Sequence, residues 1–520
     1  MSALPSEVGT AVQHLEADTV PRMVVELAER YGSAEAVVDG PVRLGFDDLL
    51  ARSVTAAQAL LAAGVGPGAR VAMLLPNGWR YGAIYLGTQL AGGVAVLVNT
   101  RLAGPEIAHI LTDSGSDVLV TTAELAARLD TEHRPRVVVA TEDLVATASP
   151  SLGMDLPGLE RDASDIAQLL YTSGTTGKPK GAMQTHANLM FNAGTVRRLL
   201  GAAPRESTLI AAPMFHAIGI VSQWVGFLSG GARCVLVPTF EPRSVVRLLA
   251  RERVTVFAGV ASMLQLILLK ARDEAADLSG LRSFVMGGSP VPASLDTEVA
   301  RQMPWLKLAN VWGLTEATSI TTYTEGAEYR ARPWSAGTAV AGVEVAVSTG
   351  GGPPGAPADT VGELCVRGPS VCPGYWANAE ATAAVIADGW LHTGDVGSID
   401  ADGHVRVLDR LKDMVIRGGE NVYSLEVENV LGTHPSVAEV AVIGLPDQVL
   451  GERVCAVVIP SPGAEPDAEA LRVHAAGSLA DYKVPTEVRF VAELPRNAAG
   501  KVLKRVLAGR EGMTVPRPGR

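Results

Sequence analysis

The sequence predicts an α/β protein with a large N-terminal domain, made of two doubly wound sheets and a β-rich subdomain, and a small α+β C-terminal domain. Short apolar runs alternate with helical patterns from residue 18 to residue 288, as in parallel sheets covered by helices. From about Ser335, prolines, glycines and short strands replace this alternation. From about Asp413 a further mixture of helices and strands begins. A chain of 520 residues is too long for one ordinary core.

The first part of the chain predicts one doubly wound parallel sheet. Glycines and prolines punctuate the pattern: Gly64 closes the second helix, and Pro76-Asn77-Gly78 ends a buried strand. Residues 141–164 are rich in Pro, Ser and Asp and are expected to form a surface connection. The expected helices are 20–30, 47–63 and 105–113, and the expected strands are 37–38, 71–75, 94–98, 118–120 and 137–140.

The same kind of apolar pattern predicts a second α/β sheet and the C-terminal domain. Residues 166–170 are expected to form a buried strand and residues 188–192 a helix. For the second sheet we expect strands at 209–213, 234–237, 254–257 and 283–288, and helices at 244–252 and 262–271. For the C-terminal domain we expect helices at 426–431 and 467–479, and strands at 437–445, 453–460 and 488–491.

Composition excludes several classes of function. With 47% hydrophobic and 19% charged residues the chain is globular, and its net charge of −11 argues against a nucleic-acid surface. The four cysteines are scattered, with no CxxC pair or Cys/His cluster to suggest zinc, so we expect buried thiols in a reducing compartment.

Two charge-poor stretches, 81–100 and 209–232, are long enough to raise the question of a membrane span. Glycines interrupt the first, and Pro213, His216 and Gln223 interrupt the second. Each fits a buried helix beside a buried parallel strand better than a bilayer span. The N-terminus has no apolar run of signal-peptide type. We therefore expect a cytoplasmic enzyme without a membrane segment, and leave open whether it forms a homodimer.

The stretch from Tyr171 to Gly181 concentrates hydroxyls, glycines and two lysines directly after a buried strand. Glycines let backbone N–H groups approach phosphate oxygens, hydroxyls add donors and lysine adds positive charge. The pattern is not a Walker loop, because Pro179 follows Gly177-Lys178. The alternative is a flexible surface turn. The candidate phosphate-binding residues are Thr172, Ser173, Gly174, Thr175, Thr176, Gly177 and Lys178.

The segment from Asn310 to Thr318 follows another predicted buried strand. Trp312 offers a flat face for an adenine ring, Thr315 a hydroxyl for phosphate, and Glu316 a carboxylate for Mg²⁺, which favours such ligands together with substrate phosphates. The alternative is an ordinary helix start with Thr315 as N-cap. Asn310 and Gly313 belong to the same candidate site.

Four further motifs are candidates for nucleotide binding, and each also has a purely structural interpretation. Gly287-Gly288-Ser289 could form a backbone wall against adenine or a strand-to-helix turn. Asp395 suits vicinal ribose hydroxyls, but Asp is also common in turns. Arg410 could reach the ribose or α-phosphate, or belong to a surface charge cluster. Lys501 could swing into a site on a mobile loop, or be an ordinary exposed lysine.

These motifs, in this order and across nearly the whole chain, resemble those of the adenylate-forming superfamily, which holds acyl-CoA synthetases, luciferases and peptide-synthetase adenylation domains. Two departures are visible. Trp312 stands where the family more often has Tyr, which keeps stacking but removes a phenolic hydrogen bond. Asn497-Ala498-Ala499 replaces the commoner Thr-x-Ser before Gly500-Lys501.

The resemblance implies an AMP-forming ligase that uses ATP, Mg²⁺ and coenzyme A. It assigns catalysis to Lys501, Glu316, Thr175 and His216, and magnesium to Glu316 and Thr175. It also assigns the ribose to Asp395, a hinge to Lys412 and the wall of the pantetheine tunnel to Gly418 and Gly419. The implied domains are 1–411 for AMP binding and 412–520 for the mobile C-terminal part.

The implied reaction activates a carboxylic acid as acyl-adenylate, releases pyrophosphate, and transfers the acyl group to CoA with release of AMP. His216, otherwise a satisfied core histidine, borders the acid pocket by this resemblance. No acidic residue lies between Met214 and Gly230 to pair with a substrate ammonium. We therefore expect a medium- or long-chain fatty acid or a hydrophobic ring acid, unless Arg233 or Arg282 lies closer to the pocket and favours a diacid.

Three alternatives remain at this point: an adenylation enzyme that loads a carrier-protein phosphopantetheine, a monooxygenase of luciferase type, and a non-catalytic nucleotide-binding protein. The expected pocket walls for the acid are His216, Gly219, Val260, Gly287 and Ser319.

Overall fold

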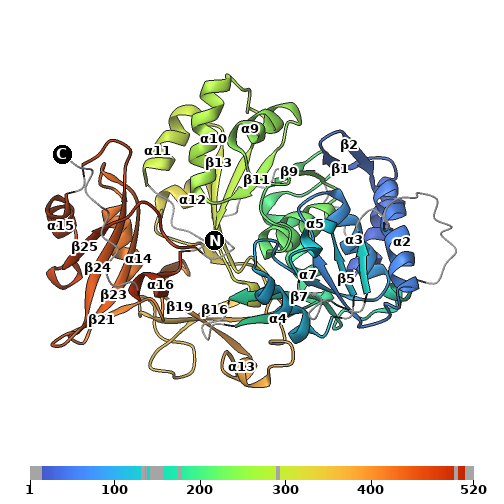
Figure 1. The fold of residues 1–520 in the computed structure, drawn as a ribbon. Coiled ribbons are helices and arrows are strands. Elements are labelled where there is room, and N and C mark those ends of the chain that lie inside the picture. The colour runs from blue at the N-terminus through green and yellow to red at the C-terminus, as the bar shows by residue number, and fades with distance from the viewer. Residues whose placement is uncertain are drawn as a thin grey trace.

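The fold consists of four sheets, of nine, six, five and five strands, with helices packed on the two larger ones (Figure 1). The computed structural model describes residues 15–116, 118–129, 135, 137–140, 144, 156–173, 178–287, 293–465, 467–496 and 502–509. This arrangement confirms the predicted α/β class with its β-rich and C-terminal parts.

The six-stranded sheet carries the strand that leads into the candidate phosphate loop. Its strands are parallel except for the last pair, β7 and β8, which is antiparallel. β4 and β5 are buried at every position, as expected where both faces of a parallel sheet are covered. In spatial order the strands are β6 (Val137–Ala140), β5 (Val118–Thr121), β3 (Arg70–Leu74), β4 (Val94–Leu97), β7 (Ile166–Ser173) and β8 (Pro179–Thr185).

The nine-stranded sheet carries the other half of the N-terminal domain. Its centre is parallel, and antiparallel strands close it at both edges. In spatial order the strands are β15 (Thr338–Ala339), β14 (Thr322–Glu325), β13 (Lys307–Trp312), β12 (Ser283–Gly287), β11 (Val256–Gly259), β9 (Ser207–Ile210), β10 (Arg233–Leu236), β1 (Glu35–Asp39) and β2 (Val42–Gly45).

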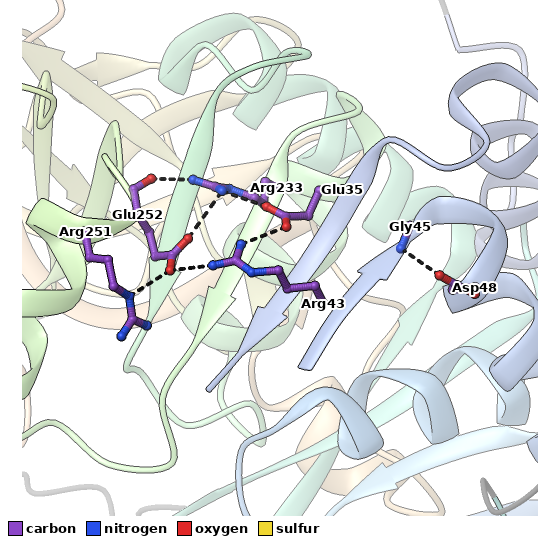
Figure 2. A network of polar contacts seen from close by, with 7 residues as sticks. All are labelled: Glu35, Arg43, Gly45, Asp48, Arg233, Arg251 and Glu252. Carbon is purple, nitrogen blue, oxygen red and sulfur yellow. Dashed lines mark hydrogen bonds and ion pairs between the residues drawn. The ribbon is translucent and has the colours of Figure 1, made fainter. Parts of the chain in front are cut away.

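The sequence prediction for β1 was wrong in one respect. The strand at Val37-Val38 was expected in the first sheet, but it joins the second, where Val37 pairs with Cys234 of β10. An apolar run predicts that a strand is buried but not which strand it pairs with, since the partner here is almost 200 residues away. Arginines and glutamates fasten this edge, as Figure 2 shows: Arg43 of β2 and Arg233 of β10 both contact Glu35 of β1.

Helices cover the two large sheets. They are α1 (Val20–Tyr31), α2 (Phe46–Ala62), α3 (Trp79–Leu90), α4 (Gly104–Ser114), α5 (Ala123–Ala126), η2 (Pro157–Glu160), α7 (His186–Leu200), η3 (Ile218–Val225), α8 (Gly226–Ser229), α9 (Pro242–Arg251), α10 (Ala261–Glu274), α11 (Ala293–Gln302), η4 (Thr315–Ala317) and α12 (Gly326–Ala331).

The first charge-poor stretch is α3 followed by β4, as predicted, and every residue of α3 except Arg80 is buried. Gly82 allows this close packing, since a Cβ there would lie 2.2 Å from the Trp224 ring of η3. No helix in the described part of the chain is long and apolar enough to cross a membrane.

The β-rich subdomain and the C-terminal domain each have one five-stranded sheet. The first contains β16 (Glu344–Ser348), β17 (Gly362–Arg367), β18 (Ile386–Ala387), β19 (Trp390–Ile399) and β20 (Val405–Arg410), with helix α13 (Ala379–Ala383). The second contains β21 (Val415–Arg417), β22 (Glu420–Val422), β23 (Val437–Asp447), β24 (Gly451–Pro460) and β25 (Glu487–Phe490), with α14 (Ser424–Leu431), α15 (Ala468–Ala476), η5 (Asp481–Lys483) and α16 (Lys504–Ala508). Figure 1 shows the C-terminal sheet and its helices, in orange and red, at one end of the molecule beside β19.

Candidate active site

The candidate phosphate loop connects two antiparallel strands. β7 ends at Ser173 and β8 begins at Pro179, with Thr172 opposite Lys180. The expected order of strand, loop and helix was therefore incomplete, because β8 intervenes and α7 begins only at His186. Proline and glycine at the start of β8 hide its strand character in the sequence. Gly174, Thr175, Thr176 and Gly177 lie outside the described residues, and Lys178 is exposed.

Glu316 lies at the end of this hairpin. Its Oε1 accepts a hydrogen bond from the Thr172 hydroxyl at 3.4 Å and a shorter one from the Tyr375 hydroxyl at 2.7 Å. Gln184 of β8 fixes the adjoining backbone by donating to the Thr315 carbonyl at 2.7 Å. Among the described residues, both side-chain hydrogen bonds to Glu316 go to Oε1, so Oε2 is available for another ligand. The structure thus brings together two predicted residues, Thr172 and Glu316.

Tyr375 was not predicted. It belongs to an irregular segment that runs along β8, where Tyr375 bridges Ala182 and the Trp376 amide donates to the Gly181 carbonyl at 2.8 Å. Burial, together with the charge of Glu316, raises the pKa of the Tyr375 phenol, so its hydroxyl stays a donor. No motif in the sequence marks this tyrosine, because its role depends on the pairing of two distant segments.

Asp395 forms the second polar centre. It is 3% exposed, and its carboxylate accepts from the Trp312 indole N–H at 2.8 Å and pairs with the Arg410 guanidinium at 2.5 Å. The antiparallel register of β19 and β20 sets Arg410 directly opposite Asp395. The structure therefore joins three predicted residues in one contact. The Trp312 side chain, expected as a flat face for adenine, is largely buried, and its N–H is committed to Asp395.

The ends of β12 and β13 in the nine-stranded sheet carry further candidate residues. Gly287 ends β12 beside Val311 of β13, and a Cβ on Gly287 would lie 2.7 Å from the Val311 side chain. Gly313 must be glycine, since a Cβ there would lie 1.5 Å from the Ser319 carbonyl oxygen. The Asn310 amide donates to the Ser335 carbonyl at 3.0 Å. Gly288 and Ser289 lie outside the described residues.

His216 lies between β9 and η3, in a loop whose first residues are held by Asn77. The Asn77 amide donates to the Ala212 carbonyl at 2.9 Å and accepts from the Met214 amide at 2.8 Å. The Nε2 atom of His216 is buried and has no hydrogen-bond partner among the described residues. It is therefore not the satisfied core histidine of the alternative interpretation. Burial, and then the nearby charge of Arg101, lowers the pKa of His216 to about 4, so the imidazole is neutral at pH 7.

Ser222 of η3 and Ser319, one of the expected pocket walls, are joined by a hydrogen bond of 2.8 Å. The two arginines considered for this pocket are engaged elsewhere. Arg233 contacts Glu35 and Glu252 (Figure 2), and Arg282 pairs with Glu206 at 2.6 Å. Arg101, which the sequence analysis did not single out, is instead the cation that acts on His216.

The region around Lys412 joins the β-rich subdomain to the C-terminal sheet. The Leu411 amide donates to the Gly394 carbonyl at 2.8 Å, next to Asp395. Gly418 and Gly419 form the turn between β21 and β22 with φ of 62° and 89°, a region that favours glycine. Lys501 lies outside the described residues, while its neighbour Val502 pairs with Arg496.

Comparison with known proteins supplies the context for this geometry. The family described as AMP-binding enzyme matches residues 24–376, and the AMP-binding enzyme C-terminal domain matches residues 426–501. A feruloyl-CoA synthase from Amycolatopsis sp is 40% identical over 474 residues, which is 91% of this chain and 94% of that protein. The long-chain-fatty-acid–CoA ligase FadD13 of Mycobacterium tuberculosis is 34% identical over 482 residues, covering 92% of this chain and 95% of that protein.

Among solved structures, the o-succinylbenzoate CoA synthetase MenE of Bacillus subtilis with its acyl-adenylate intermediate has a TM-score of 0.85 at 30% identity, covering 94% of this chain and 98% of that one. The same protein has also been solved with ATP and a magnesium ion, with a TM-score of 0.84 at 30% identity, covering 93% and 98% of the two chains.

Proposed function

Because this chain belongs to the AMP-binding enzyme family, we propose that it is an ATP-dependent carboxylic acid–CoA ligase. In the first step a carboxylate oxygen attacks the α-phosphorus of ATP, and pyrophosphate leaves. In the second step the CoA thiolate attacks the carbonyl carbon of the acyl-adenylate, and AMP leaves. The observation that carries this proposal is the contact between candidate residues from distant parts of the chain at two centres, Thr172 with Glu316 and Arg410 with Asp395.

We assign the β- and γ-phosphates of ATP, which leave as pyrophosphate, to the β7–β8 hairpin. Phosphoryl transfer depends mostly on positioning and on neutralising charge, so hydroxyls, glycine amides and a lysine suit this role. Lys178 at the start of β8 supplies the positive charge. The residues we assign to the β- and γ-phosphates are Thr172, Ser173, Gly174, Thr175, Thr176, Gly177 and Lys178.

Glu316 fits a magnesium ion. Mg²⁺ is usually bound by one or two carboxylates and by phosphate oxygens. The Tyr375 and Thr172 hydroxyls hold the Glu316 carboxylate by one oxygen and leave the other available. Bound there with Thr175, the ion would neutralise phosphate charge. The task of Tyr375 in this scheme is to fix the carboxylate.

Asp395 is assigned to the ribose hydroxyls, and Arg410, beside it, to the ribose or α-phosphate. The Trp312 N–H and the Arg410 guanidinium hold this buried carboxylate from two sides, which preorganises it as an acceptor. Gly287, Gly288, Ser289, Asn310, Gly313 and Thr315 are assigned to the remaining nucleotide contacts.

His216 is assigned to the acid. Its buried Nε2 lacks a partner among the described residues and, as a neutral imidazole, can donate to a substrate carboxylate. We place a hydrophobic ring acid first as substrate and a medium- or long-chain fatty acid second. Two considerations support this order: the higher identity to a feruloyl-CoA synthase than to a fatty-acid ligase, and the hydroxyl pair of Ser222 and Ser319 at the expected pocket wall.

Lys501 is assigned to the α-phosphate and carboxylate during the first step. We propose domains 1–411 and 412–520, with rotation about Lys412 between the two steps, so that Gly418 and Gly419 then line the path of the CoA thiol. We also propose that the enzyme works in the cytoplasm, and that it forms a homodimer, which light scattering would test.

Acid-dependent ATP–pyrophosphate exchange tests the activity and narrows the substrate. Exchange should appear with Mg²⁺ and one class of aryl or fatty acid and be absent without acid. Addition of CoA should then yield an acyl-CoA and AMP. Thioester formation on a carrier protein but not on CoA would favour the alternative function, a stand-alone adenylation enzyme. Exchange with none of the acids would contradict the proposal.

A further inference from the structure

Three potential metal ligands meet on one face of the β-rich subdomain. Glu363 and Cys365 lie two residues apart on β17, so their side chains point to the same side of the sheet. β19 runs antiparallel beside β17, and its register sets His392 directly opposite Cys365. No local motif marks this cluster, because Cys365 and His392 are 27 residues apart in the chain.

The distances match a small coordination site. The Cys365 Sγ lies 3.5 Å from the His392 Nδ1, the Glu363 Oε2 lies 2.8 Å from the same nitrogen, and the three ligand atoms lie within 4.8 Å of one another. Tetrahedral zinc with ordinary bond lengths separates a sulfur from a nitrogen by roughly 3.6 Å and a nitrogen from an oxygen by roughly 3.3 Å. The observed distance between Sγ and Nδ1 already fits zinc. The distance between Nδ1 and Oε2 would have to increase by roughly 0.5 Å when the metal binds.

We propose that Glu363, Cys365 and His392 form a binding site for a divalent transition metal, with Zn²⁺ as the best fit. A thiolate, an imidazole and a carboxylate suit this borderline-soft ion, and three protein ligands leave one position for water. Binding releases the Cys365 thiol proton, and the proton of neutral His392 moves from Nδ1 to Nε2. This site is separate from the magnesium site at Glu316, since Mg²⁺ prefers oxygen ligands.

The site can be reached from solvent on one side only. Cys365 is fully buried, whereas the side chains of His392 and Glu363 are 22% and 20% exposed. Burial, and then the charge of Glu363, raises the pKa of the Cys365 thiol to about 12. The thiol thus keeps its proton in the metal-free protein, and a metal must displace that proton to gain a buried thiolate ligand.

The cluster is joined to the nucleotide site through the backbone. The Glu363 Oε1 accepts from the Gly394 amide at 2.9 Å, and Asp395 follows directly. The Thr393 hydroxyl also links the two strands, as it donates to the Leu364 carbonyl and accepts from the Asp395 amide. A metal that draws Glu363 toward it would change the hydrogen bond between Glu363 and the Gly394 amide, and with it the position of Asp395. We therefore expect Zn²⁺ to shift the KM for ATP.

Cobalt binding to the metal-stripped full-length protein tests the site without nucleotide or acid, so its outcome is independent of the proposed ligase activity. We expect one Co²⁺ per chain, a near-ultraviolet thiolate-to-cobalt charge-transfer band, and loss of that band when Zn²⁺ is added. Cys365→Val should abolish the band and weaken Zn²⁺ binding at least about tenfold.

Cys455→Val is the matched control, because Cys455 is also a buried thiol in a strand, in the C-terminal sheet. It should keep the band. If Cys365→Val does not fold, as judged by its thermal transition, His392→Asn retains the thiol and should weaken Co²⁺ binding by a similar factor. Absence of the band in the unaltered protein, or its persistence in Cys365→Val, would overturn the proposal.

Discussion

Tyr375 is the residue on which the orientation of the Glu316 carboxylate most depends. Its hydroxyl makes the shorter of the two hydrogen bonds to that carboxylate, and hydrogen bonds to charged groups contribute about 1.5–3 kcal/mol. We predict that Tyr375→Phe lowers the rate of ATP–pyrophosphate exchange by roughly 10- to 150-fold, at an unchanged thermal midpoint.

Tyr323→Phe is the matched control for this prediction. The Tyr323 hydroxyl also donates to a glutamate, Glu325, at 3.0 Å, and it lies outside the proposed site. Exchange should stay near the level of the unaltered enzyme in this variant. Equal losses in both variants would show that Tyr375 has no special link to Glu316 chemistry.

Candidate site residues could be picked out from the sequence where one short motif marks them. Glu316, Asp395 and Arg410 were singled out by their local context, and the fold brings each next to another candidate. Tyr375 and Arg101 could not be found in this way. Tyr375 matters because its segment pairs with β8, and Arg101 because it lies near His216. Both contacts join residues that are distant in the chain, so no local sequence motif marks them.

Helices α1 and α7 meet around His186, which is 2% exposed and accepts through Nδ1 from the Val20 amide at 3.4 Å. Burial, and then the charge of Arg161, lowers the pKa of this imidazole to about 4 in the folded protein. Between this value and about 6.5, where an unfolded histidine titrates, the unfolded chain binds the extra proton. The stabilising contribution is thus full above about pH 6.5 and is lost as pH falls toward 4.

We predict that His186→Asn reduces the dependence of the unfolding free energy on pH in this window. A depression of this size corresponds to roughly 3 kcal/mol between the ends of the window. Urea unfolding at a series of pH values from 7 to 4.5 measures it. An unchanged slope in the variant would assign the acid sensitivity to other groups.

A largely buried ion pair joins helix α16 to α14, and α14 in turn contacts β20, the strand that precedes Lys412. The Lys504 ammonium lies 2.6 Å from both the Glu428 carboxylate and the Ser424 hydroxyl, and Ser424 in turn donates to Asp409 of β20 at 2.9 Å. Burial raises the pKa of Glu428 and of Asp409, and Lys504 opposes that rise. Without Lys504, the carboxylates of Glu428 and Asp409 would stay buried but lose the positive charge that offsets the cost of burying them.

We predict that Lys504→Met lowers the free energy of unfolding by about 3–5 kcal/mol at pH 7, the usual cost of removing one partner of a buried pair. Lys483→Met is the control, because Lys483 pairs with the more exposed Glu426 of the same domain. Its cost should stay below about 1 kcal/mol. Similar urea midpoints for the two variants would contradict the role given to Lys504.

Helices and strands could be predicted where their pattern of apolar residues directly reflects which side chains are buried. The apolar runs of β3, β4 and β5 and the helix patterns of α9 and α10 are found close to their expected positions. Strand partners could not be predicted, and β1 consequently joined a different sheet. β8 was missed, because a strand that begins Pro-Lys-Gly lacks the β-branched residues that mark strands in sequence.

We propose that the two parts of the molecule, residues 1–411 and 412–520, divide the ligase reaction between them. The residues that we assign to phosphate, magnesium and ribose lie before residue 411, whereas Lys501 lies after it. The two half-reactions should therefore depend on different residues. Mg²⁺ removal by a chelator should abolish the first half-reaction, since the phosphate charge would then lack its main counterion.

We propose that Lys501 takes part in adenylation alone, and the decisive experiment measures both half-reactions in the Lys501→Ala variant. Pyrophosphate release from acid plus ATP should fall below detection, because the charge developing at the α-phosphate is no longer neutralised. The same variant, given a synthetic acyl-adenylate and CoA, should form acyl-CoA at close to the rate of the unaltered enzyme. Equal loss of both half-reactions would contradict the two-step, two-domain account.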